Sequence, residues 1–236
     1  ACEETRLGVV ADKVIKNAIT TNLVYRDIRD LATVGVVGED PAADIVEVAQ
    51  PLGPIFAVTP ITNPTSTALF KILIALKARN PILIRPHGAA RKCTIRAAQL
   101  CYEAALAAGA PEHCIQWIKR STQDETVALM GHRAVAMNLA TGSVDLVRAA
   151  HRSGNPTIGV GPGNVPVYIG KSADVPFAVE QVHRSKLFDY GTICASEQAM
   201  VVRACHARQV HEEFARRSAY FVTGDEVDRL GEVAYN

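Results

Sequence analysis

The sequence of 236 residues has almost no net charge, since 25 lysines and arginines are balanced by 24 aspartates and glutamates. Nucleic-acid-binding domains usually carry a clear basic excess, so this balance argues against a nucleic-acid partner. The sequence contains no apolar run long enough to span a bilayer, and we expect no membrane segment. Its first residues lack the basic region and apolar core of a secretory signal peptide. Together these absences favour a protein that works in the cytoplasm.

Paired cysteines and metal-ligand spacings are missing as well. Six cysteines are scattered along the chain without a CxxC pair, namely Cys2, Cys93, Cys101, Cys114, Cys194 and Cys205. This scatter is typical of reduced thiols in a cytosolic enzyme rather than of a disulfide framework. His206 and His211 fall outside the i,i+4 spacing of a helical zinc pair, and we expect no metal site.

Apolar residues make up 48% of the chain and charged residues 21%, which is the composition of a globular protein with a sizeable core. From residue 55 onward, strand-like segments alternate with helical ones. The predicted strands are 55–58, 82–84, 115–118, 135–139, 157–160 and 165–169, and the predicted helices are 64–78, 89–108, 122–130, 143–152 and 175–187. This alternation predicts right-handed βαβ units, and hence an α/β fold with a doubly wound, mostly parallel sheet.

Two further elements are expected before this alternation begins. Residues 12–30 have the period of an amphipathic helix, and residues 44–50 alternate like a strand. The residues near the apolar stripe of the helix are Val14, Ile15, Ala18, Ile19, Leu23 and Ile28.

Ligands of doubly wound sheets bind at the carboxyl ends of the strands, so the loops that follow strands are where we look for a site. The first loop ends in Asn63-Pro64, where Asn63 is placed to cap the following helix. Asn63 could instead donate a side-chain hydrogen bond to a developing oxyanion. The second loop is Arg85-Pro86-His87-Gly88, in which Arg85 or His87 could meet ribose or phosphate, or form a solvated turn.

The third and fourth loops contain glycine. Ala140-Thr141-Gly142-Ser143 enters a helix that Ser143 can cap, and its amides would face an anion bound above that helix. This is not the GxGxxG fingerprint, and on its own the loop is better explained as a capped turn. The segment Gly159–Asn164 holds three glycines in five residues, which predicts a tight turn or a close approach of ligand to backbone.

Cys194 stands out among the cysteines because of its surroundings. It lies in a polar, glycine-broken loop, with helical sequence before it and strand-like sequence after it. A thiol on such a turn can be exposed, as a nucleophile must be, and Gly191 lets the backbone approach a reacting carbonyl closely. The alternative is that Cys194 is a small apolar residue filling a gap beneath the loop.

Taken together in this order, the loops resemble the aldehyde dehydrogenase superfamily, most closely its CoA-acylating branch. The segments that carry the resemblance are 63–67, 85–87, 140–143, 159–164 and 191–197. The segment Thr192-Ile193-Cys194-Ala195-Ser196-Glu197-Gln198 is the most specific, and the similarity extends to Asp12–Asn17.

The resemblance implies a role for each loop. Cys194 is the nucleophile that attacks the aldehyde carbonyl, and Asn63 forms the oxyanion hole with the backbone amide of Cys194. For the nucleotide, it implies Thr141, Gly142 and Ser143 at the pyrophosphate, Arg85, Pro86 and His87 at the adenosine end, and the loop with Gly161 and Gly163 at the nicotinamide. NAD is the expected cofactor, with NADP still open, and coenzyme A is the expected co-substrate.

One departure from the wider superfamily is informative. In hydrolytic members, the segment that matches Gly159–Asn164 begins with a glutamate that activates water, and here the matching residue is Gly159. Without that base, a thioester on Cys194 is poorly set up for hydrolysis, whereas a thiol acceptor brings its own nucleophile. The missing carboxylate therefore favours transfer to coenzyme A.

The resemblance also implies a domain plan. Residues 1–187 are expected to form a Rossmann-like nucleotide-binding domain, and residues 188–236 the beginning of a second α/β catalytic domain. Because superfamily members extend well beyond both ends of this sequence, we expect a fragment of a longer chain, and a homo-oligomer in the full-length protein. A bacterial microcompartment is the alternative to a cytoplasmic location.

Three alternatives of function stay open from the sequence. The substrate could be acetaldehyde, propionaldehyde or a polar aldehyde such as sulfoacetaldehyde. The enzyme could be a non-acylating aldehyde or semialdehyde-phosphate dehydrogenase of the same superfamily. The chain could also be a non-catalytic nucleotide-binding or structural module.

Overall fold

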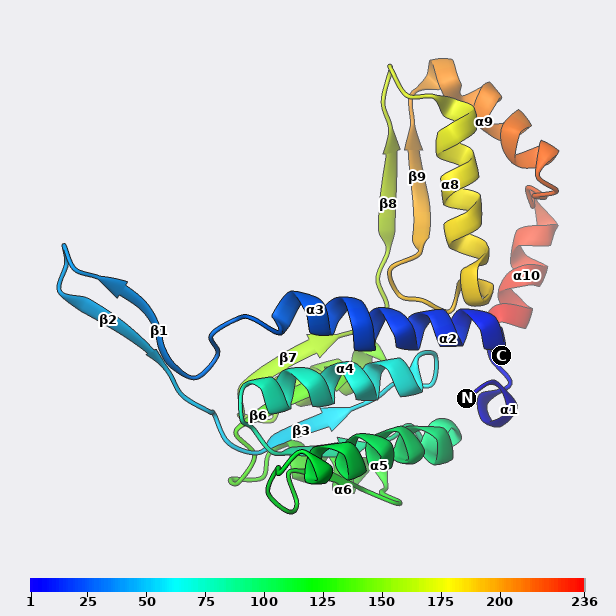
Figure 1. Cartoon of the computed structure of the whole chain (residues 1–236). Coiled ribbons are helices and arrows are strands. Elements are labelled where there is room, and N and C mark those ends of the chain that lie inside the picture. Colours follow the sequence, from blue (N-terminus) through cyan, green and yellow to red (C-terminus); the bar gives the residue numbers. More distant parts are fainter. Residues whose placement is uncertain (236) are drawn as a thin grey trace. The chain divides into compact units, whose positions relative to one another are not determined.

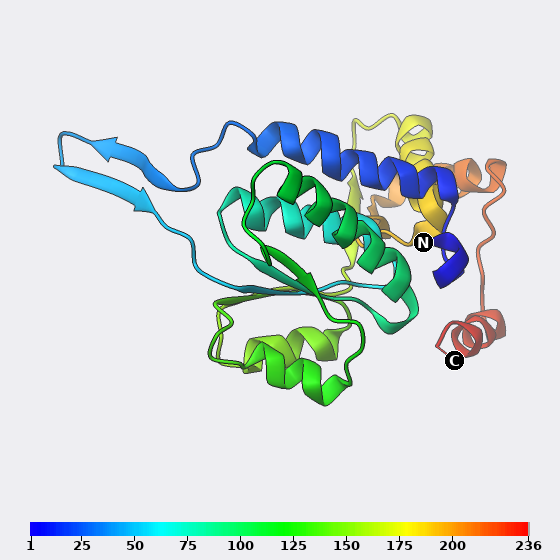
Figure 2. The same cartoon turned by 60° about the horizontal axis from the view of Figure 1, so that its bottom comes forward.

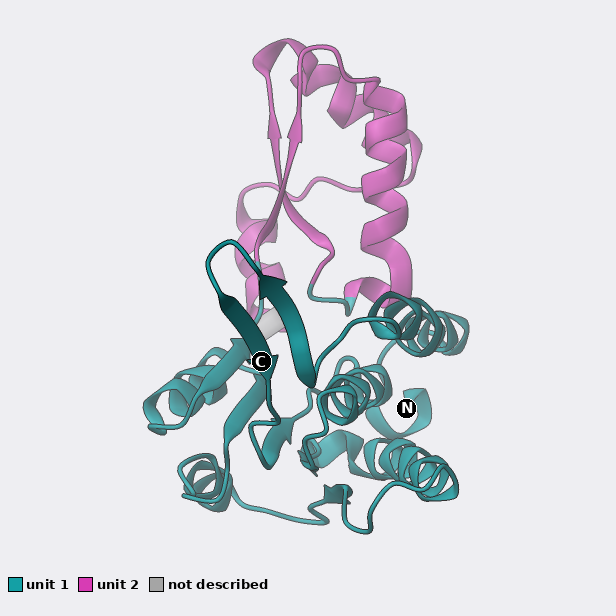
Figure 3. Cartoon of the chain, turned by 60° about the vertical axis from the view of Figure 1, so that its left-hand side comes forward, with its two compact units in different colours: residues 1–163, 192–194 teal, residues 164–191, 195–236 magenta. Residues whose placement is uncertain are grey.

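The computed structural model describes residues 1–235, without the side chains of the last two of these, and is shown in Figure 1. The chain divides into two compact units, coloured separately in Figure 3. Unit 1 comprises residues 1–163 and 192–194, and unit 2 comprises residues 164–191 and those from 195 onward. The first division between the units falls after Gly163, and the domain boundary expected after residue 187 stays a prediction.

Unit 1 is built on a five-stranded sheet in which every neighbouring pair is parallel. Its strands are β3 (Ile55–Val58), β4 (Ile82–Arg85), β5 (Ile115–Trp117), β6 (Met137–Thr141) and β7 (Thr157–Val160), in the order β5-β4-β3-β6-β7. The first strand in sequence lies at the centre, and later strands are added on both sides of it. This arrangement confirms the predicted doubly wound parallel sheet.

Helices cover both faces of this sheet, as Figures 1 and 2 show. On one face, α4 (Pro64–Lys77) and α5 (Arg91–Ala107) pack over a core that includes Ile72, Ile84 and Ala98. On the other face, α6 (Gln123–Met130) and α7 (Val144–Arg152) pack over a core that includes Phe56 and Met130. A short 3₁₀ turn (η2, Gly88–Ala90) precedes α5.

The predicted helix at residues 12–30 forms, but in three parts and with a different face buried. After the short α1 (Cys2–Thr5), it runs as α2 (Val10–Ala18), a π-helical stretch (η1, Ile19–Val24) and α3 (Tyr25–Ile28). Its buried residues are polar, namely Lys13, Lys16 and Thr20. Most of the predicted apolar stripe is exposed, including Val14, Ile15, Ile19 and Leu23. The expected burial of that stripe is wrong for this structure, because the side that faces α4 carries the lysines.

A β-hairpin follows this helix and reaches away from the sheet in both cartoon views (Figures 1 and 2). The predicted strand at residues 44–50 is present as β2 (Ile45–Ala49). It pairs antiparallel with β1 (Gly35–Asp40), a strand that the sequence analysis did not predict.

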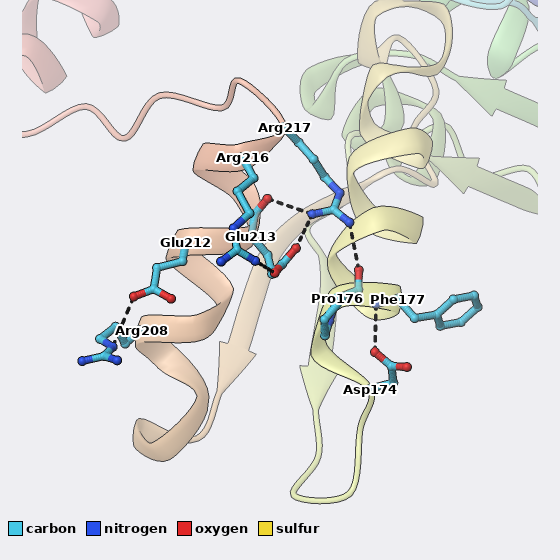
Figure 4. A network of polar contacts seen from close by, with 8 residues as sticks. All are labelled: Asp174, Pro176, Phe177, Arg208, Glu212, Glu213, Arg216 and Arg217. Carbon is cyan, nitrogen blue, oxygen red and sulfur yellow. Dashed lines mark hydrogen bonds and ion pairs between the residues drawn. The ribbon is translucent and has the colours of Figure 1, made fainter.

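Unit 2 contains a parallel pair of strands, β8 (Val165–Ile169) and β9 (Glu197–Val202), that is separate from the larger sheet. The helices α8 (Val175–Leu187) and α9 (Ala204–Arg216) contribute to its core, and a 3₁₀ turn (η3, Phe188–Gly191) and α10 (Asp225–Tyr235) complete it. A polar network joins α8 to α9, as Figure 4 shows: Arg217 bonds both the Glu213 carboxylate and the Pro176 carbonyl oxygen. The hydrogen bond from Arg217, reinforced by the charge of Arg216, lowers the pKa of Glu213.

The described residues provide neither a membrane-spanning helix nor a metal cluster. None of their helices is both long and apolar enough to cross a bilayer. They also contain no cluster of three or more histidine, cysteine, aspartate or glutamate side chains able to hold a metal ion.

Candidate active site

The site lies in unit 1 at the topological switch point of the sheet, between β3 and β6. The neighbouring strands β3 and β6 are followed by helices on opposite faces, so their carboxyl ends leave a crevice of the kind that binds ligands. A cavity of about 450 Å³ is found here. Its lining residues are Lys16, Ile19, Thr20, Asn63, Ser66, Thr67, Phe70, Lys71, Ile74, Leu139, Thr141, Ile158, Val160 and Ile193. None of these lining residues carries a carboxylate.

Asn63 occupies the capping position of α4, yet its side chain makes no capping hydrogen bond. Its Nδ2 donates to the backbone oxygen of Thr192 at 3.2 Å and to Thr62 Oγ1 at 3.2 Å. Its Oδ1 accepts a hydrogen bond of 2.6 Å from Lys16 Nζ. The helix-cap alternative is therefore wrong, and the amide group is directed toward the segment that precedes Cys194.

Cys194 is exposed and follows Thr192 by two residues. Its backbone oxygen lies 3.6 Å from the position that a Cβ on Gly163 would occupy. Residues from three distant parts of the chain thus meet in unit 1: Asn63, the 192–194 segment and the glycine-containing loop. The alternative in which the Cys194 thiol fills a buried gap does not hold in this structure.

Lys71 is a buried lysine in the wall of the same cavity, and the sequence analysis did not single it out. Its Nζ donates 2.6 Å hydrogen bonds to the backbone oxygens of Val58 and Leu139, which lie on β3 and β6. Burial lowers the pKa of this group from its ordinary value to about 7. A neutral amine has two N–H groups, which matches the two carbonyl acceptors.

The lowered pKa of Lys71 predicts a pH-dependent contribution to stability. An unfolded lysine titrates near pH 10.4, so above about pH 7 the unfolded chain holds a proton that the folded chain has released. The free energy of unfolding should therefore rise with pH in this window, by up to about 1.4 kcal/mol per pH unit from this group. Lys71→Met removes the contribution, and its stability relative to the wild type should fall as pH rises.

Urea unfolding at about pH 7.5 and pH 9 measures this difference. Lys77→Met is the matched control, because Lys77 also bonds a backbone oxygen, that of Arg29, at the partly exposed end of α4. Comparing the two variants separates the effect of burying the amine from that of losing a hydrogen bond between a lysine and a backbone oxygen. Wild-type and Lys71→Met stabilities that stay parallel across the range would contradict the assignment.

Of the predicted nucleotide loops, Thr141–Ser143 lies at the cavity. Thr141 lines it, and Ser143 caps α7 by accepting a hydrogen bond of 3.3 Å from the Leu146 amide, as predicted. A Cβ on Gly142 would lie 2.8 Å from Leu146 Cδ2, so this position fits a residue without a side chain.

The Arg85 loop lines a second cavity, of about 430 Å³, at the ends of β4 and β5. Arg85 and Pro86 share it with the cationic residues Arg91, Lys119 and Arg120. Arg85 Nε donates to Ser121 Oγ at 3.2 Å, and burial lowers the pKa of the guanidinium. His87 instead accepts a hydrogen bond from the Ala89 amide, and burial and the charge of Arg85 lower its pKa. The second cavity is thus strongly basic.

Gly159, the position that matches the glutamate of hydrolytic relatives, faces α7 rather than the cavity. A Cβ on Gly159 would lie 2.6 Å from Val147 Cγ1 and 2.8 Å from His151 Nε2, so this position faces α7 and has no room for a side chain. The residues of β7 that line the cavity are Ile158 and Val160. The β7 positions that face the cavity are therefore apolar, and Gly159 itself does not face it. Gly161 and Gly163 have only ordinary contacts at the Cβ position, and they lie near Gly142 and Cys194 respectively.

Two buried lysines at the site, Lys13 and Lys16, were missed from the sequence. They belong to the Asp12–Asn17 segment that contributed to the family resemblance, but the helical pattern gave them no role. The signal that could have found them is their i,i+3 spacing, which places both on one face of α2.

Comparisons with known proteins show which family the chain is similar to. The aldehyde dehydrogenase family profile matches residues 11–234. Aldehyde-alcohol dehydrogenase 2 from Entamoeba histolytica is 46% identical over 230 residues, which is 98% of this chain and 26% of that protein. An acetylating aldehyde dehydrogenase structure from Geobacillus thermoglucosidasius superposes with a TM-score of 0.90 at 48% identity, covering 95% of this chain and 50% of that one.

A third comparison is with a propionaldehyde dehydrogenase structure from Rhodopseudomonas palustris that has bound CoA and an acylated cysteine. It superposes with a TM-score of 0.82 at 28% identity, covering 97% of this chain and 52% of that one. The chain therefore spans about half of each of these two solved structures, and about a quarter of aldehyde-alcohol dehydrogenase 2.

Proposed function

The chain belongs to the aldehyde dehydrogenase family, and on that basis we propose that it holds the nucleotide-binding region and the nucleophile of a CoA-acylating aldehyde dehydrogenase. The reaction would interconvert a short-chain aldehyde, by default acetaldehyde, with the corresponding acyl-CoA. The observation that carries the proposal is the pairing of an exposed Cys194 with an Asn63 amide that does not cap its own helix.

In the proposed reaction, the Cys194 thiolate adds to the aldehyde carbonyl. The Asn63 amide donates a hydrogen bond to the oxygen on which negative charge develops, which stabilises the tetrahedral intermediate. Collapse of that intermediate leaves an acyl group on Cys194 as a thioester. A nicotinamide nucleotide, when bound, supplies the acceptor for the hydride lost in this oxidation.

The described residues fit such a nucleotide. Thr141 lines the first cavity, and α7, whose N-terminus favours phosphate, begins three residues later at Val144. Arg85 and its cationic neighbours line the second cavity at the same edge of the sheet, and suit ribose or phosphate groups. We propose NAD as the nucleotide, and the basic second cavity leaves NADP open.

The second half of the reaction distinguishes this proposal from a hydrolytic dehydrogenase. No lining residue of the cavity is an aspartate or glutamate that could draw a proton from water. The thiol of coenzyme A is a far better nucleophile than neutral water and depends less on a base. Exchange between two thioesters is close to balanced, so acyl-CoA reduction to the aldehyde should also proceed. We further propose a homo-oligomer, located in the cytoplasm or in a microcompartment.

The test is NADH formation from acetaldehyde by the purified protein, with and without coenzyme A. With coenzyme A present, we expect continuous turnover. Without coenzyme A, we expect one equivalent of NADH per Cys194, after which the rate of NADH formation should fall at least about 100-fold. Sustained turnover without coenzyme A would indicate a non-acylating dehydrogenase. Neither NADH formation nor acylation of Cys194 would favour a non-catalytic module.

A further inference from the structure

The orientation of the Asn63 amide depends on a buried lysine from the N-terminal helix. Lys16 is 5% exposed, and its Nζ lies 2.6 Å from Asn63 Oδ1 and 3.4 Å from Thr192 Oγ1. Lys16 Nζ donates this hydrogen bond, and the atom of a carboxamide that can accept it is the oxygen. The NH₂ group then faces the other way, where it donates to the Thr192 backbone oxygen and to Thr62 Oγ1.

This orientation is the one that an oxyanion hole requires. A carboxamide is nearly symmetric in shape, and after a half-turn Asn63 would present an oxygen to the developing negative charge instead of a donor. The half-turn would also turn the NH₂ group toward Lys16 Nζ and remove the oxygen that accepts its hydrogen bond. Lys16 therefore makes the unproductive orientation unfavourable.

The helix that carries Lys16 is itself fixed against the Asn63 loop. Lys13 Nζ donates to the Thr62 backbone oxygen at 2.5 Å, and Thr65 Oγ1 donates to Asn17 Oδ1 at 2.9 Å. Burying two lysine side chains is costly unless their charged ends are hydrogen-bonded. One face of α2 thus bonds three closely spaced residues, Thr62, Asn63 and Thr65.

We propose that Lys16 is a positioning residue for acyl transfer, acting through Asn63 to keep the amide N–H directed at the oxyanion; this inference rests on the proposed function. A merely structural lysine would tether the helix to the loop without affecting chemistry on Cys194. The two roles predict different outcomes when the reaction is measured in the presence and in the absence of Asn63.

The experiment compares Lys16→Met, Lys16→Arg, Asn63→Ala and the Lys16→Met/Asn63→Ala double variant. Two rates are measured: kcat for NADH formation, and acylation of Cys194 by acetyl-CoA without nucleotide, followed by intact mass. The second reaction also passes through a tetrahedral oxyanion. Alkylation of Cys194 by iodoacetamide is the internal control, because no oxyanion forms in that displacement. Lys77→Met is the matched variant control, since Lys77 bonds a backbone oxygen remote from Asn63.

For Lys16→Met we expect kcat and the acylation rate to fall roughly 30-fold, with the KM for aldehyde and the alkylation rate within about threefold of wild type. Lys16→Arg keeps the donor and should recover most of the loss. In the Asn63→Ala background, Lys16→Met should cost less than about threefold, because the group that it positions is gone. Lys77→Met should match the wild type.

Two results would overturn the inference while leaving the proposed function intact. One is an active Lys16→Met enzyme with wild-type acylation. The other is the same fold loss from Lys16→Met with and without Asn63. If Lys16→Met does not fold, Lys16→Leu, which also removes the hydrogen-bond donor, carries the same comparison. A wild-type protein that neither forms NADH nor becomes acylated would overturn the proposed function and this inference with it.

Discussion

Replacing Cys194 with alanine should abolish NADH formation, with a loss of at least about 1,000-fold, while nucleotide binding is retained. The size of the effect follows from the proposed chemistry, because the aldehyde has no other nucleophile to which it can become attached. Retention of nucleotide binding follows because the cavities that adjoin Thr141 and Arg85 do not depend on the thiol for their walls. Turnover is followed by absorbance of NADH, and binding by quenching or transfer of protein fluorescence.

Cys205→Ala is the appropriate control for this variant. Cys205 is the other exposed thiol among the described residues, and it lies on α9 in unit 2. Burial raises the pKa of Cys93 and Cys101, so their slow reaction with thiol reagents would be a weak comparison. A nucleophilic Cys194 should react with such reagents much faster than Cys205 near neutral pH. Wild-type turnover by Cys194→Ala would refute the proposed mechanism.

Asn63→Ala should lower kcat by about 100- to 1,000-fold, with a much smaller change in the KM for aldehyde. The reason is that the amide contributes mainly when charge develops on the carbonyl oxygen, and contributes little to binding of the neutral aldehyde. The structure gives Asn63 no capping role whose loss would weaken α4, so the variant should remain folded. The split between kcat and KM, measured from initial rates, checks this.

Asn63→Asp sharpens the same test. Aspartate has nearly the same shape and can still accept the hydrogen bond from Lys16, but its carboxylate cannot donate to an oxyanion. It should therefore be at least as slow as Asn63→Ala, although its contact with Lys16 becomes an ion pair. If Asn63→Asp kept activity within about threefold of wild type, donation from the amide would not be part of the mechanism.

The sheet and its helices could be predicted from the sequence because their pattern is local. Apolar segments of strand length, glycines and helix caps such as Ser143 lie within a few residues of the elements that they define. Strand β1 (Gly35–Asp40) was missed because its own residues do not show a strand pattern. Its two glycines and two acidic residues are types that strands usually contain little of. That strand is instead defined by its partner β2 across the hairpin.

The N-terminal helix shows where local pattern fails. Its most apolar side was expected to be buried, yet Val14 and Ile15 are exposed while Lys13 and Lys16 are buried. The lysines are stabilised there by oxygen atoms of the Thr62–Asn63 loop, about 47 residues further along the chain. No periodicity within the helix contains that information. The family resemblance brought Asn63 and Cys194 together, but the contact that orients the amide could only be seen in three dimensions.

The hydrogen bond between Asn63 and Thr192 joins residues 129 positions apart. At the usual rates of translation, about 5 to 20 residues per second, the second partner leaves the ribosome roughly 6 to 26 seconds after the first. The sheet of unit 1 can form in that interval, since its last strand ends at Val160. The growing chain can therefore fold the scaffold of the site before the thiol of Cys194 has been synthesised.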